Sequence, residues 1–299
     1  MAYTEIRKEK DRIKYYRVHT FRSKDKVSHL RKFLGSNLKR KELEMKEHEA
    51  DAVLIDPLNN LLNKQERDSL DEIKQEHQSK HISTFENRYE AFISEFTYDS
   101  TGIEGNTLTL RETAGVLFEG ATPAKSLREI YEVLNHKRAF DYILGYKGKI
   151  NKKFICEIQK IVTENTLKPE LLEQAGTFRI VPVFIRGADV TPPPPEIIGY
   201  EMKRLIIWYS KNKKTIHPLI LATYFHSALE AIHPFVDGNG RTGRLLLNFI
   251  LHNHGYPMVS VPRSQRLKYF DTLAKAQKGN LRPFVVFLLG LLKKAEKSI

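Results

Sequence analysis

The chain has little of what stabilises secreted or membrane-spanning proteins. Cys156 is the single cysteine among 299 residues, so no disulfide can form within the chain. That composition suits a reducing compartment. No long uncharged apolar run is present, and the first residues carry too many charges for a signal peptide. These absences exclude a disulfide-rich scaffold, and we expect a cytoplasmic protein without a membrane-spanning segment.

Internal repeats and low-complexity tracts are also absent. With 41% hydrophobic residues, the chain can bury a substantial core, as one large domain or two modest ones. Apolar residues recur at helical spacing through most of the sequence from residue 84 onward. The pattern predicts a mainly α-helical fold with small β-like additions.

Positive charge is unevenly distributed. The formal net charge is +13, and residues 1–41 carry fourteen Lys or Arg against four Asp or Glu. Two β-like runs around a charged turn at residues 22–26 predict a hairpin in this segment. The rings of Tyr15, Tyr16 and Phe21 lie among the basic residues. The segment could bind nucleic acid through charge and stacking, or it could be an edge hairpin with solvated lysines.

A charged, helix-like stretch follows at residues 42–83 and is too polar to bury much surface. We expect it to be a helical linker between the basic segment, residues 1–41, and a main domain, residues 84–299. The main domain is expected to begin with an amphipathic helix, because Phe85, Tyr89, Phe92 and Phe96 follow helical spacing.

Ser100 and Glu104 lie four residues apart at the end of this first helix. They share a face if the helix continues, and Gly105 and Asn106 would then end it. Further helices are expected over residues 107–175, beginning with a capping box at Thr109. Cys156 is interpreted as a small core residue, because nothing near it in sequence would activate a thiol.

Residues 176–195 break the helical pattern. Two β-like runs flank an Arg-Gly turn and predict a hairpin, in which Pro182 would keep one strand at an edge. An exposed edge of this kind can receive an extended peptide by strand addition. Helices are then expected over residues 196–210, 218–232, 245–252, 264–277 and 284–292.

The most informative stretch is the loop between two of these helices, where residues 233–244 read HPFVDGNGRTGR. Three of the 16 glycines fall within these twelve residues and permit close approach of backbone N–H groups to a ligand. The loop leads into a helix N-terminus, which favours anions. Arg241 and Arg244 can fork onto phosphate oxygens, Asp237 is a hard ligand for Mg²⁺, and His233 can accept a proton. Together they indicate a transfer reaction on a nucleotide.

This loop matches the signature of the Fic family, His-Pro-Phe-x-(Asp/Glu)-Gly-Asn-(Gly/Lys)-Arg-x-x-Arg, at every specified position. The chain therefore resembles Fic proteins over about residues 84–292. The resemblance implies a Fic fold and the transfer of AMP from ATP, with Mg²⁺, to a Ser, Thr or Tyr hydroxyl of a protein, including the enzyme itself. Gly240, where a kinase-like branch carries Lys, favours AMP transfer over phosphate transfer.

The resemblance also implies roles for single residues. His233 would be the general base, and Asp237 would hold Mg²⁺. The phosphates would lie against Gly238, Asn239, Gly240 and Arg241, with Arg244 on the γ-phosphate. Adenine would lie near Asn248 and the aromatic pair at 269–270, in which Tyr269 is the expected contact.

Ser100 and Glu104 resemble the inhibitory motif of the family, (Ser/Thr)-x-x-x-Glu-(Gly/Asn). Glu104 would then pair with Arg244 and displace the γ-phosphate, which spoils the alignment of the α-phosphate. The 176–195 hairpin resembles the flap that clamps the target, through Val183, Phe184 and Ile185.

Three alternatives remain open. Glu104 could position a water, which would make the protein a de-AMPylase or a two-way enzyme. The chain could be a regulatory nucleic-acid-binding module that uses residues 1–41. It could also act as a homodimer.

Overall fold

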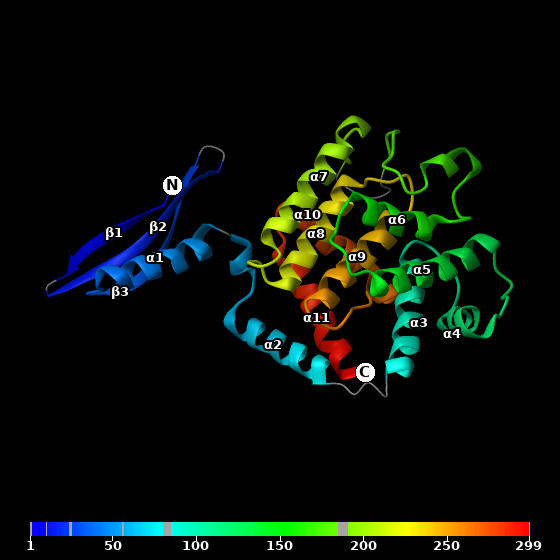
Figure 1. The fold of residues 1–299 in the computed structure, drawn as a ribbon, viewed down its shortest axis with the longest axis horizontal. Coiled ribbons are helices and arrows are strands. Elements are labelled where there is room, and N and C mark those ends of the chain that lie inside the picture. Colours follow the sequence, from blue (N-terminus) through cyan, green and yellow to red (C-terminus); the bar gives the residue numbers. More distant parts are fainter. Residues whose placement is uncertain are drawn as a thin grey trace. The chain divides into compact units, whose positions relative to one another are not determined.

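The computed structural model describes residues 2–9, 11–23, 26–55, 57–79, 85–184 and 191–298. The chain divides into two compact units, residues 1–63 and 64–299 (Figure 1). No helix among the described residues has both the length and the apolar character needed to cross a membrane.

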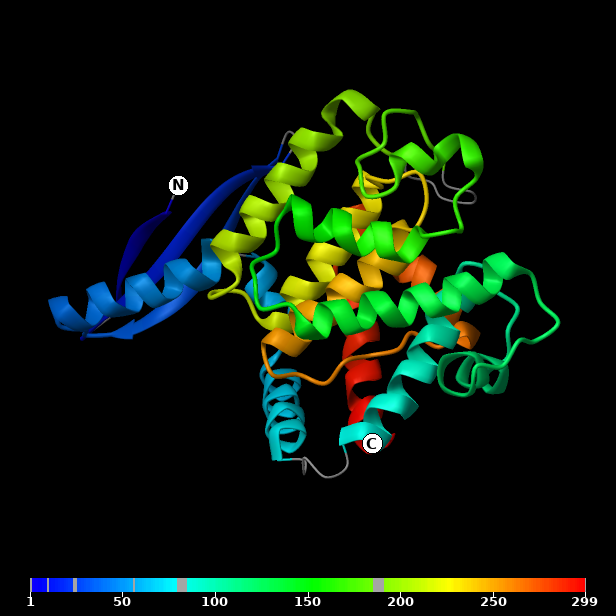
Figure 2. The same ribbon diagram turned by 45° about the vertical axis from the view of Figure 1, so that its right-hand side comes forward.

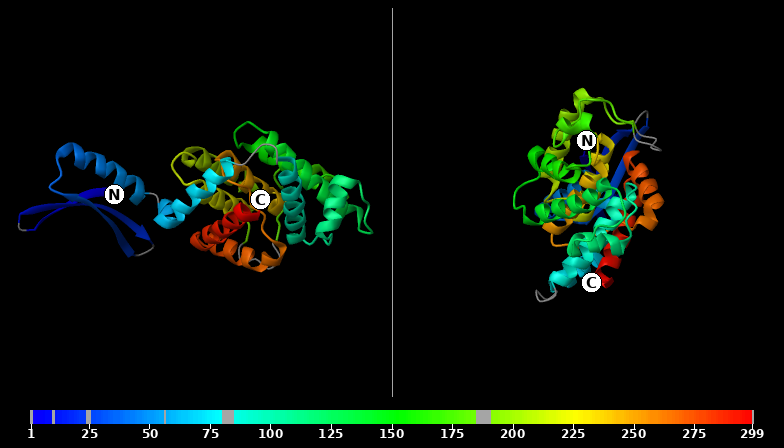
Figure 3. Two further views of the ribbon diagram at one scale, coloured as in Figure 1. Left: turned by 90° about the horizontal axis from the view of Figure 1, so that it is seen from below. Right: turned by 90° about the vertical axis from the view of Figure 1, so that its right-hand side faces the viewer.

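The first unit is a three-stranded antiparallel sheet with a helix along it (Figure 3, left). Strands β1 (Ala2–Glu9), β2 (Arg12–Ser23) and β3 (Lys26–Ser36) pair in sequence order, and a bulge lies at Tyr15/Tyr16 of β2. Helix α1 (Arg40–Ile55) packs on β2 and β3, and the short 3₁₀ helix η1 (Pro57–Leu61) follows it. Strands β2 and β3 confirm the predicted hairpin. Strand β1 was not predicted, because most of its residues are polar or charged.

The expected linker at residues 42–83 is not one element in the structure. Helix α1 joins the first unit, where Glu47 contacts Thr4 and Arg17 of the sheet and Ala50 is buried. Helix α2 (Lys64–Ser79) joins the second unit and packs on its last helix. Apolar residues spaced three apart, Leu70 and Ile73, give α2 a buried stripe despite its high charge.

In its described residues the second unit is a helical bundle without strands, built around two central helices (Figure 2). These are α8 (Pro218–Ile232) and α9 (Asn239–Asn253), which pack against each other and are buried along nearly their whole length. The sequence of α8 is apolar on most of its faces, as expected of a helix enclosed by others, whereas α9 also buries polar side chains, among them Arg241 and Arg244. Because residues 233–238 join these two helices, the predicted active loop begins between two elements that are buried along nearly their whole length.

Other helices surround this central pair on several sides. In chain order they are α3 (Phe85–Ile103), α4 (Leu110–Ala114), the π-helical turn η3 (Gly115–Glu119), α5 (Leu127–Gly145), α6 (Lys152–Thr163), η4 (Pro169–Gln174), α7 (Pro195–Asn212), η5 (Arg263–Gln265), α10 (Arg266–Gln277) and α11 (Arg282–Ser298). Helix α4 begins with the predicted capping box at Thr109 and Glu112. Cys156 is a buried residue of α6, and burial raises the pKa of its thiol to about 11, which confirms its place in the core.

The predicted hairpin at residues 176–195 is not formed in the part of that segment that the structure describes. Residues 176–184 and 191–194 contain no strand. Prolines at 182 and 192–194 cannot donate to a ladder. The guanidinium of Arg179 instead joins the two sides, since it donates to the carbonyls of Val181 and Pro193.

Candidate active site

The loop after α8 turns sharply because two of its residues adopt left-handed backbone conformations. His233 caps the C-terminus of α8 with φ 49° and ψ 61°, and Gly238 precedes α9 with φ 79°. A Cβ on Gly238 would lie 2.9 Å from the Thr163 side chain of α6, so glycine is required there for space as well as for conformation. The two turns place His233 and the N-terminus of α9 in one compact loop.

Asn239 holds this loop in shape from within. Its side-chain oxygen accepts from the N–H of Phe235 at 2.9 Å, and its side-chain nitrogen donates to the carbonyl of the same residue at 2.8 Å. Phe235 itself is fully buried. The side chain of Asn239 therefore holds the loop together through one accepted and one donated hydrogen bond.

Arg179 holds the loop from outside, a role that the sequence did not reveal. Its side chain is among the largest that are fully buried, and its Nε donates to the carbonyl of His233 at 2.8 Å. Its backbone N–H donates to the carbonyl of Pro234 at 2.9 Å. Burial lowers the pKa of Arg179 from its ordinary value. One residue thus fixes the backbone beside His233 and both sides of the 176–195 segment. The one feature of the sequence that could have indicated this role is the position of Arg179, a charged residue directly before the apolar run 180–185.

His233 is half-buried, and burial lowers the pKa of its imidazole below the ordinary value for histidine. Its Nδ1 lies 3.4 Å from the carbonyl oxygen of Glu230, one turn earlier in α8. The ring is therefore neutral at physiological pH, which is the form that can accept a proton.

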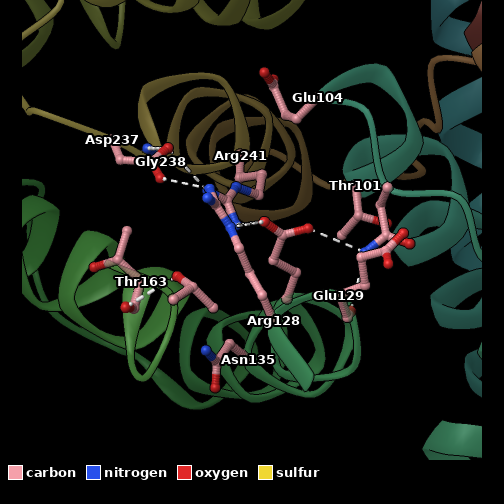
Figure 4. Close-up of polar contacts among 12 residues, drawn as sticks. Thr101, Glu104, Arg128, Glu129, Asn135, Thr163, Asp237, Gly238 and Arg241 are labelled. Carbon is pink, nitrogen blue, oxygen red and sulfur yellow. Dashed lines mark hydrogen bonds and ion pairs between the residues drawn. The ribbon is translucent and has the colours of Figure 1, made fainter. Parts of the chain in front are cut away.

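Asp237 lies among cations at the start of α9 (Figure 4). Its Oδ1 accepts from the N–H of Gly238 at 2.6 Å and from Nη2 of Arg241 at 3.1 Å. Its Oδ2 faces Nη2 of Arg128 of α5 at 3.3 Å. The described residues contain no cluster of three or more metal-ligating side chains. One carboxylate with one lightly held oxygen fits a metal that takes most of its ligands from water and phosphate, as Mg²⁺ does.

Arg244 is held by the two residues that the inhibitory motif predicted. Its Nη2 donates to Oε1 of Glu104 at 2.8 Å and to the carbonyl of Ser100 at 2.8 Å, and its Nε donates to Oγ of Ser100 at 3.0 Å. Burial alone would lower the pKa of this guanidinium, but the charge of Glu104 raises it above the ordinary value. The four-residue spacing at the C-terminal end of α3, with Glu104 directly after the last helical residue, therefore places both groups on one arginine.

The carboxylate of Glu104 also lies close to the backbone of Gly240 in the first turn of α9. A Cβ on Gly240 would come within 2.2 Å of Oε1 of Glu104. The carboxylate therefore occupies space at the helix N-terminus where a phosphate would approach.

Buried guanidinium groups face this space with donors that no group among the described residues satisfies. Arg241 and Arg244 have side chains only 3% exposed. Nε and Nη1 of Arg241 and Nη1 of Arg244 are buried without a hydrogen-bond partner in the described part of the chain. Unsatisfied buried donors are costly, so these N–H groups are suited to an anionic ligand.

A second buried polar group lies behind Arg244 and was not recognised in the sequence. Nε2 of His226 lies 2.7 Å from the hydroxyl of Tyr269, whose ring lies 5.9 Å from the guanidinium of Arg244. A Cβ on Gly243 would come within 2.6 Å of Glu230 and 2.7 Å of His226. Burial raises the pKa of Glu230 to about 8 and lowers the pKa of His226 to about 3. Both groups are therefore largely uncharged near neutral pH.

The expected adenine contacts have other partners in the structure. The Asn248 side chain bonds both the N–H and the carbonyl of Val259, at 2.8 and 2.9 Å, and so holds the segment before η5. Tyr269 is 1% exposed and belongs to the core, whereas Phe270 is 36% exposed with Arg266 4.8 Å from its ring. The exposed member of the aromatic pair is thus Phe270, and the contact of Tyr269 with adenine stays a prediction.

The predicted flap residues lie partly within the described chain. Phe184 is 90% exposed and Val183 is half-buried, while Ile185 falls outside the described residues. Gln159 of α6 links this segment to the loop, because its amide accepts from Gly176 and donates to the carbonyl of Asp237.

The fold and the site define a helical protein with a basic, glycine-rich loop at a helix N-terminus. The Fic/DOC family model matches residues 149–251, so the chain contains a Fic/DOC domain and the resemblance found in the sequence is confirmed. Two solved structures share the fold. A Fic domain-containing signaling protein from Bacteroides thetaiotaomicron has a TM-score of 0.70 and 27% identity, covering 78% of this chain and 95% of that one. Fic-1 from C. elegans has a TM-score of 0.70 and 28% identity, covering 87% and 77%.

Curated relatives agree with this assignment. Protein adenylyltransferase Fic from Drosophila persimilis is 40% identical over 202 residues, which are 66% of this chain and 39% of that protein. The protein of the same name from Drosophila melanogaster is 40% identical over 202 residues, 66% of this chain and 40% of its own length. The chain therefore spans about two fifths of the length of these relatives.

Proposed function

We propose that this chain is a protein adenylyltransferase that moves AMP from ATP to a hydroxyl group of a protein target. The observation that carries the proposal is the set of buried, unsatisfied N–H groups on Arg241 and Arg244 in the same loop as the half-buried His233, whose pKa is lowered by burial. Those groups offer a polyphosphate site and a base within one loop. The curated relatives bear the corresponding name.

In this proposal His233 takes the proton of a Ser, Thr or Tyr hydroxyl. The oxygen of the target then forms a bond to the α-phosphorus, and the bond from that phosphorus to the pyrophosphate oxygen breaks. Arg241 stabilises charge on the phosphates. Asp237 would hold Mg²⁺, which supplies charge neutralisation on the phosphates when bound. Phe184, exposed on the 176–184 segment, is available to contact the target.

The same site supports an inhibited state. Glu104 occupies Nη2 of Arg244, the arginine proposed for the γ-phosphate. A carboxylate at that position competes with a polyphosphate both for the donor and through its charge. Displacement of the α-phosphate by about 1 Å can lower a rate by about a hundredfold.

The experiment is intact-mass measurement after incubation with ATP and Mg²⁺, with His233→Ala as the comparison. The Glu104→Gly protein, in which inhibition is relieved, should gain the mass of AMP, and His233→Ala is compared with His233 in that same background. The His233→Ala protein should bind ATP but label about 10²–10⁴-fold more slowly. Labelling of the variant at the wild-type rate would exclude His233 as the base.

A reverse reaction on the same site is the second candidate. The Glu104 side chain is 37% exposed although it bonds Arg244, so its carboxylate can also reach a water. In that case the protein would release AMP from a modified target. Loss of AMP from a pre-labelled protein, absent in Glu104→Gly, would identify this activity.

Nucleic-acid binding by the first unit is a separate candidate. Phe33 is 52% exposed with its ring 5.2 Å from that of Tyr16, and the guanidinium of Arg7 lies 5.3 Å from the Tyr16 ring. Exposed rings among cations can stack on bases. Binding to single-stranded DNA and RNA that weakens with salt would support this candidate.

A further inference from the structure

We propose that Arg128 is a counter-ion of Asp237 that keeps a divalent cation out of the loop until nucleotide phosphates draw the arginine away. The inference rests on the proposed function, because it takes Asp237 as the metal ligand. It concerns a residue on α5, outside the signature loop.

The geometry places Arg128 on the oxygen that a metal would need. Oδ1 of Asp237 already accepts from Gly238 and Arg241, so Oδ2 is the oxygen left for coordination. Nη2 of Arg128 lies 3.3 Å from that Oδ2. Figure 4 shows the Arg128 side chain extending from α5 toward Asp237 and Arg241.

A second carboxylate holds Arg128 in this position. Its Nε donates to Oε1 of Glu132, four residues on in α5, at 3.2 Å. Glu132 in turn accepts from the amide of Asn106 at 3.0 Å and lies 3.8 Å from Nη1 of Arg241. If Arg128 moves away, Glu132 still contacts Asn106 and Arg241. The movement therefore does not leave a buried carboxylate without a partner.

Exposure distinguishes the two arginines near Asp237. The side chain of Arg241 is 3% exposed and enclosed by the helices, whereas that of Arg128 is 54% exposed. Only Arg128 can therefore move aside without disturbing the core. A long charged side chain at this depth can reorient its head while its stem stays packed.

The consequence is a coupling between metal and nucleotide. A metal ion that binds without nucleotide must approach Asp237 while the guanidinium of Arg128 is paired with the same carboxylate. The two positive charges would then lie a few ångströms apart and repel each other in a partly buried site. A triphosphate on the loop offers Arg128 a better partner, since arginine pairs with phosphate in a two-pronged fashion. Metal should therefore bind well only together with phosphates.

The experiment measures binding of Mn²⁺ alone, with no nucleotide, by the loss of the free-ion signal in electron paramagnetic resonance. The proteins are the full chain, Arg128→Gln, Arg128→Lys and Asp237→Asn. Arg138→Gln is the matched control, because Arg138 lies on the same helix with a 58% exposed side chain and pairs with Glu164. Thermal unfolding of each protein verifies that it is folded.

We expect Arg128→Gln to bind Mn²⁺ about tenfold more tightly than the wild type, a change typical of one lost charge interaction. Arg128→Lys and Arg138→Gln should match the wild type, and Asp237→Asn should lose the site. A second readout uses ATP with the metal removed by chelator, and there Arg128→Gln should bind several-fold more weakly.

Unchanged Mn²⁺ affinity in Arg128→Gln, with binding still lost in Asp237→Asn, would overturn the role of Arg128 and leave the metal assignment standing. Equal Mn²⁺ binding by wild type and Asp237→Asn would overturn both the metal assignment and this inference. The proposed function is tested by a separate measurement, the gain of AMP followed by mass. Failure of this inference and failure of the proposed function can therefore be distinguished.

Discussion

Burial of Glu230 links the stability of the site to pH. The pKa of this carboxyl is raised to about 8 by burial, so the folded protein keeps a proton that the unfolded chain releases near pH 4.5. The unfolded state therefore binds fewer protons than the native state between these values, and stability falls as pH rises through that window. Each tenfold difference in proton affinity between the two states corresponds to about 1.4 kcal/mol of stability.

We predict that Glu230→Gln is more heat-stable than the wild type at pH 8, by up to a few kcal/mol in unfolding free energy. The amide keeps the shape without a charge to bury. The two proteins should converge as the pH falls toward 4.5, below which the carboxyl is protonated in both states. Thermal unfolding at pH 5, 6.5 and 8 measures the difference, and a constant gap across the series would contradict the titration of Glu230.

The second prediction at the scale of single residues concerns the loss of the contact between Glu104 and Arg244. Glu104→Gly should raise the initial rate of AMP incorporation by about tenfold or more, because Nη2 of Arg244 becomes available to phosphate. Glu104→Gln, which keeps the shape but not the charge, should fall between the two.

Arg244→Ala in the Glu104→Gly background tests the mechanism of that increase. If Arg244 carries the gain, the double variant returns to the wild-type rate or below it. A double variant as fast as Glu104→Gly would show that the inhibition acts elsewhere.

At this scale the sequence predicted best where spacing along one helix decided the outcome. Ser100 and Glu104 share a face because they are four residues apart, and both bond Arg244. The contact between Asn248 and Val259 was not predicted, because Val259 takes part through its backbone and lies beyond the end of the helix, and the role of Asn248 at adenine stays a prediction. Arg128 and Glu132 were not recognised, since only folding brings α5 against the loop.

Hydrogen bonds from side chains to backbone carbonyls hold together the elements around the loop. Arg179 makes three such contacts from its guanidinium, to the carbonyls of His233, Val181 and Pro193. Periodicity predicted the helices, and α8 begins and ends at the residues expected. Within the predicted hairpin, residues 180–184 contain no strand, and the turn at residues 186–189 lies outside the described residues.

We predict that Arg179→Lys lowers the unfolding free energy by about 2 kcal/mol and slows AMP transfer. Lysine carries one ammonium and cannot reach three carbonyls that lie around a planar fork. Arg204→Lys on α7 serves as the control and should change neither property, because Arg204 pairs with Glu201 one turn earlier on the same helix. Denaturant unfolding and initial rates provide the two measurements. An Arg179→Lys protein with wild-type stability would mean that the carbonyls find other donors.

The whole molecule divides at a point that composition did not reveal. The charge pattern placed a linker at residues 42–83, whereas the compact units meet at 63/64. Helix α2 belongs to the second unit because Leu70 and Ile73 are buried and Glu66 pairs with Arg282 of α11 at 2.7 Å. Two buried side chains in a very polar helix form too weak a pattern to predict this packing.

We predict that removal of residues 1–63 leaves a folded protein with an unchanged rate of AMP transfer. Removal of residues 1–83 should instead destabilise it by several kcal/mol, because it uncovers the apolar surface that α2 buries. Differential scanning calorimetry of both truncations tests the boundary. Equal unfolding temperatures would place α2 outside the cooperative unit.

The left-handed backbone conformation of His233 has a consequence for attempts to raise the thermal stability of this protein. A residue other than glycine in that conformation costs about 1–2 kcal/mol. Glycine or asparagine would tolerate φ 49° more easily, so a laboratory selection for heat resistance alone should enrich these residues at position 233. Every such clone would lack the proposed base. Selection for heat resistance and selection for the proposed catalysis therefore oppose each other at this position.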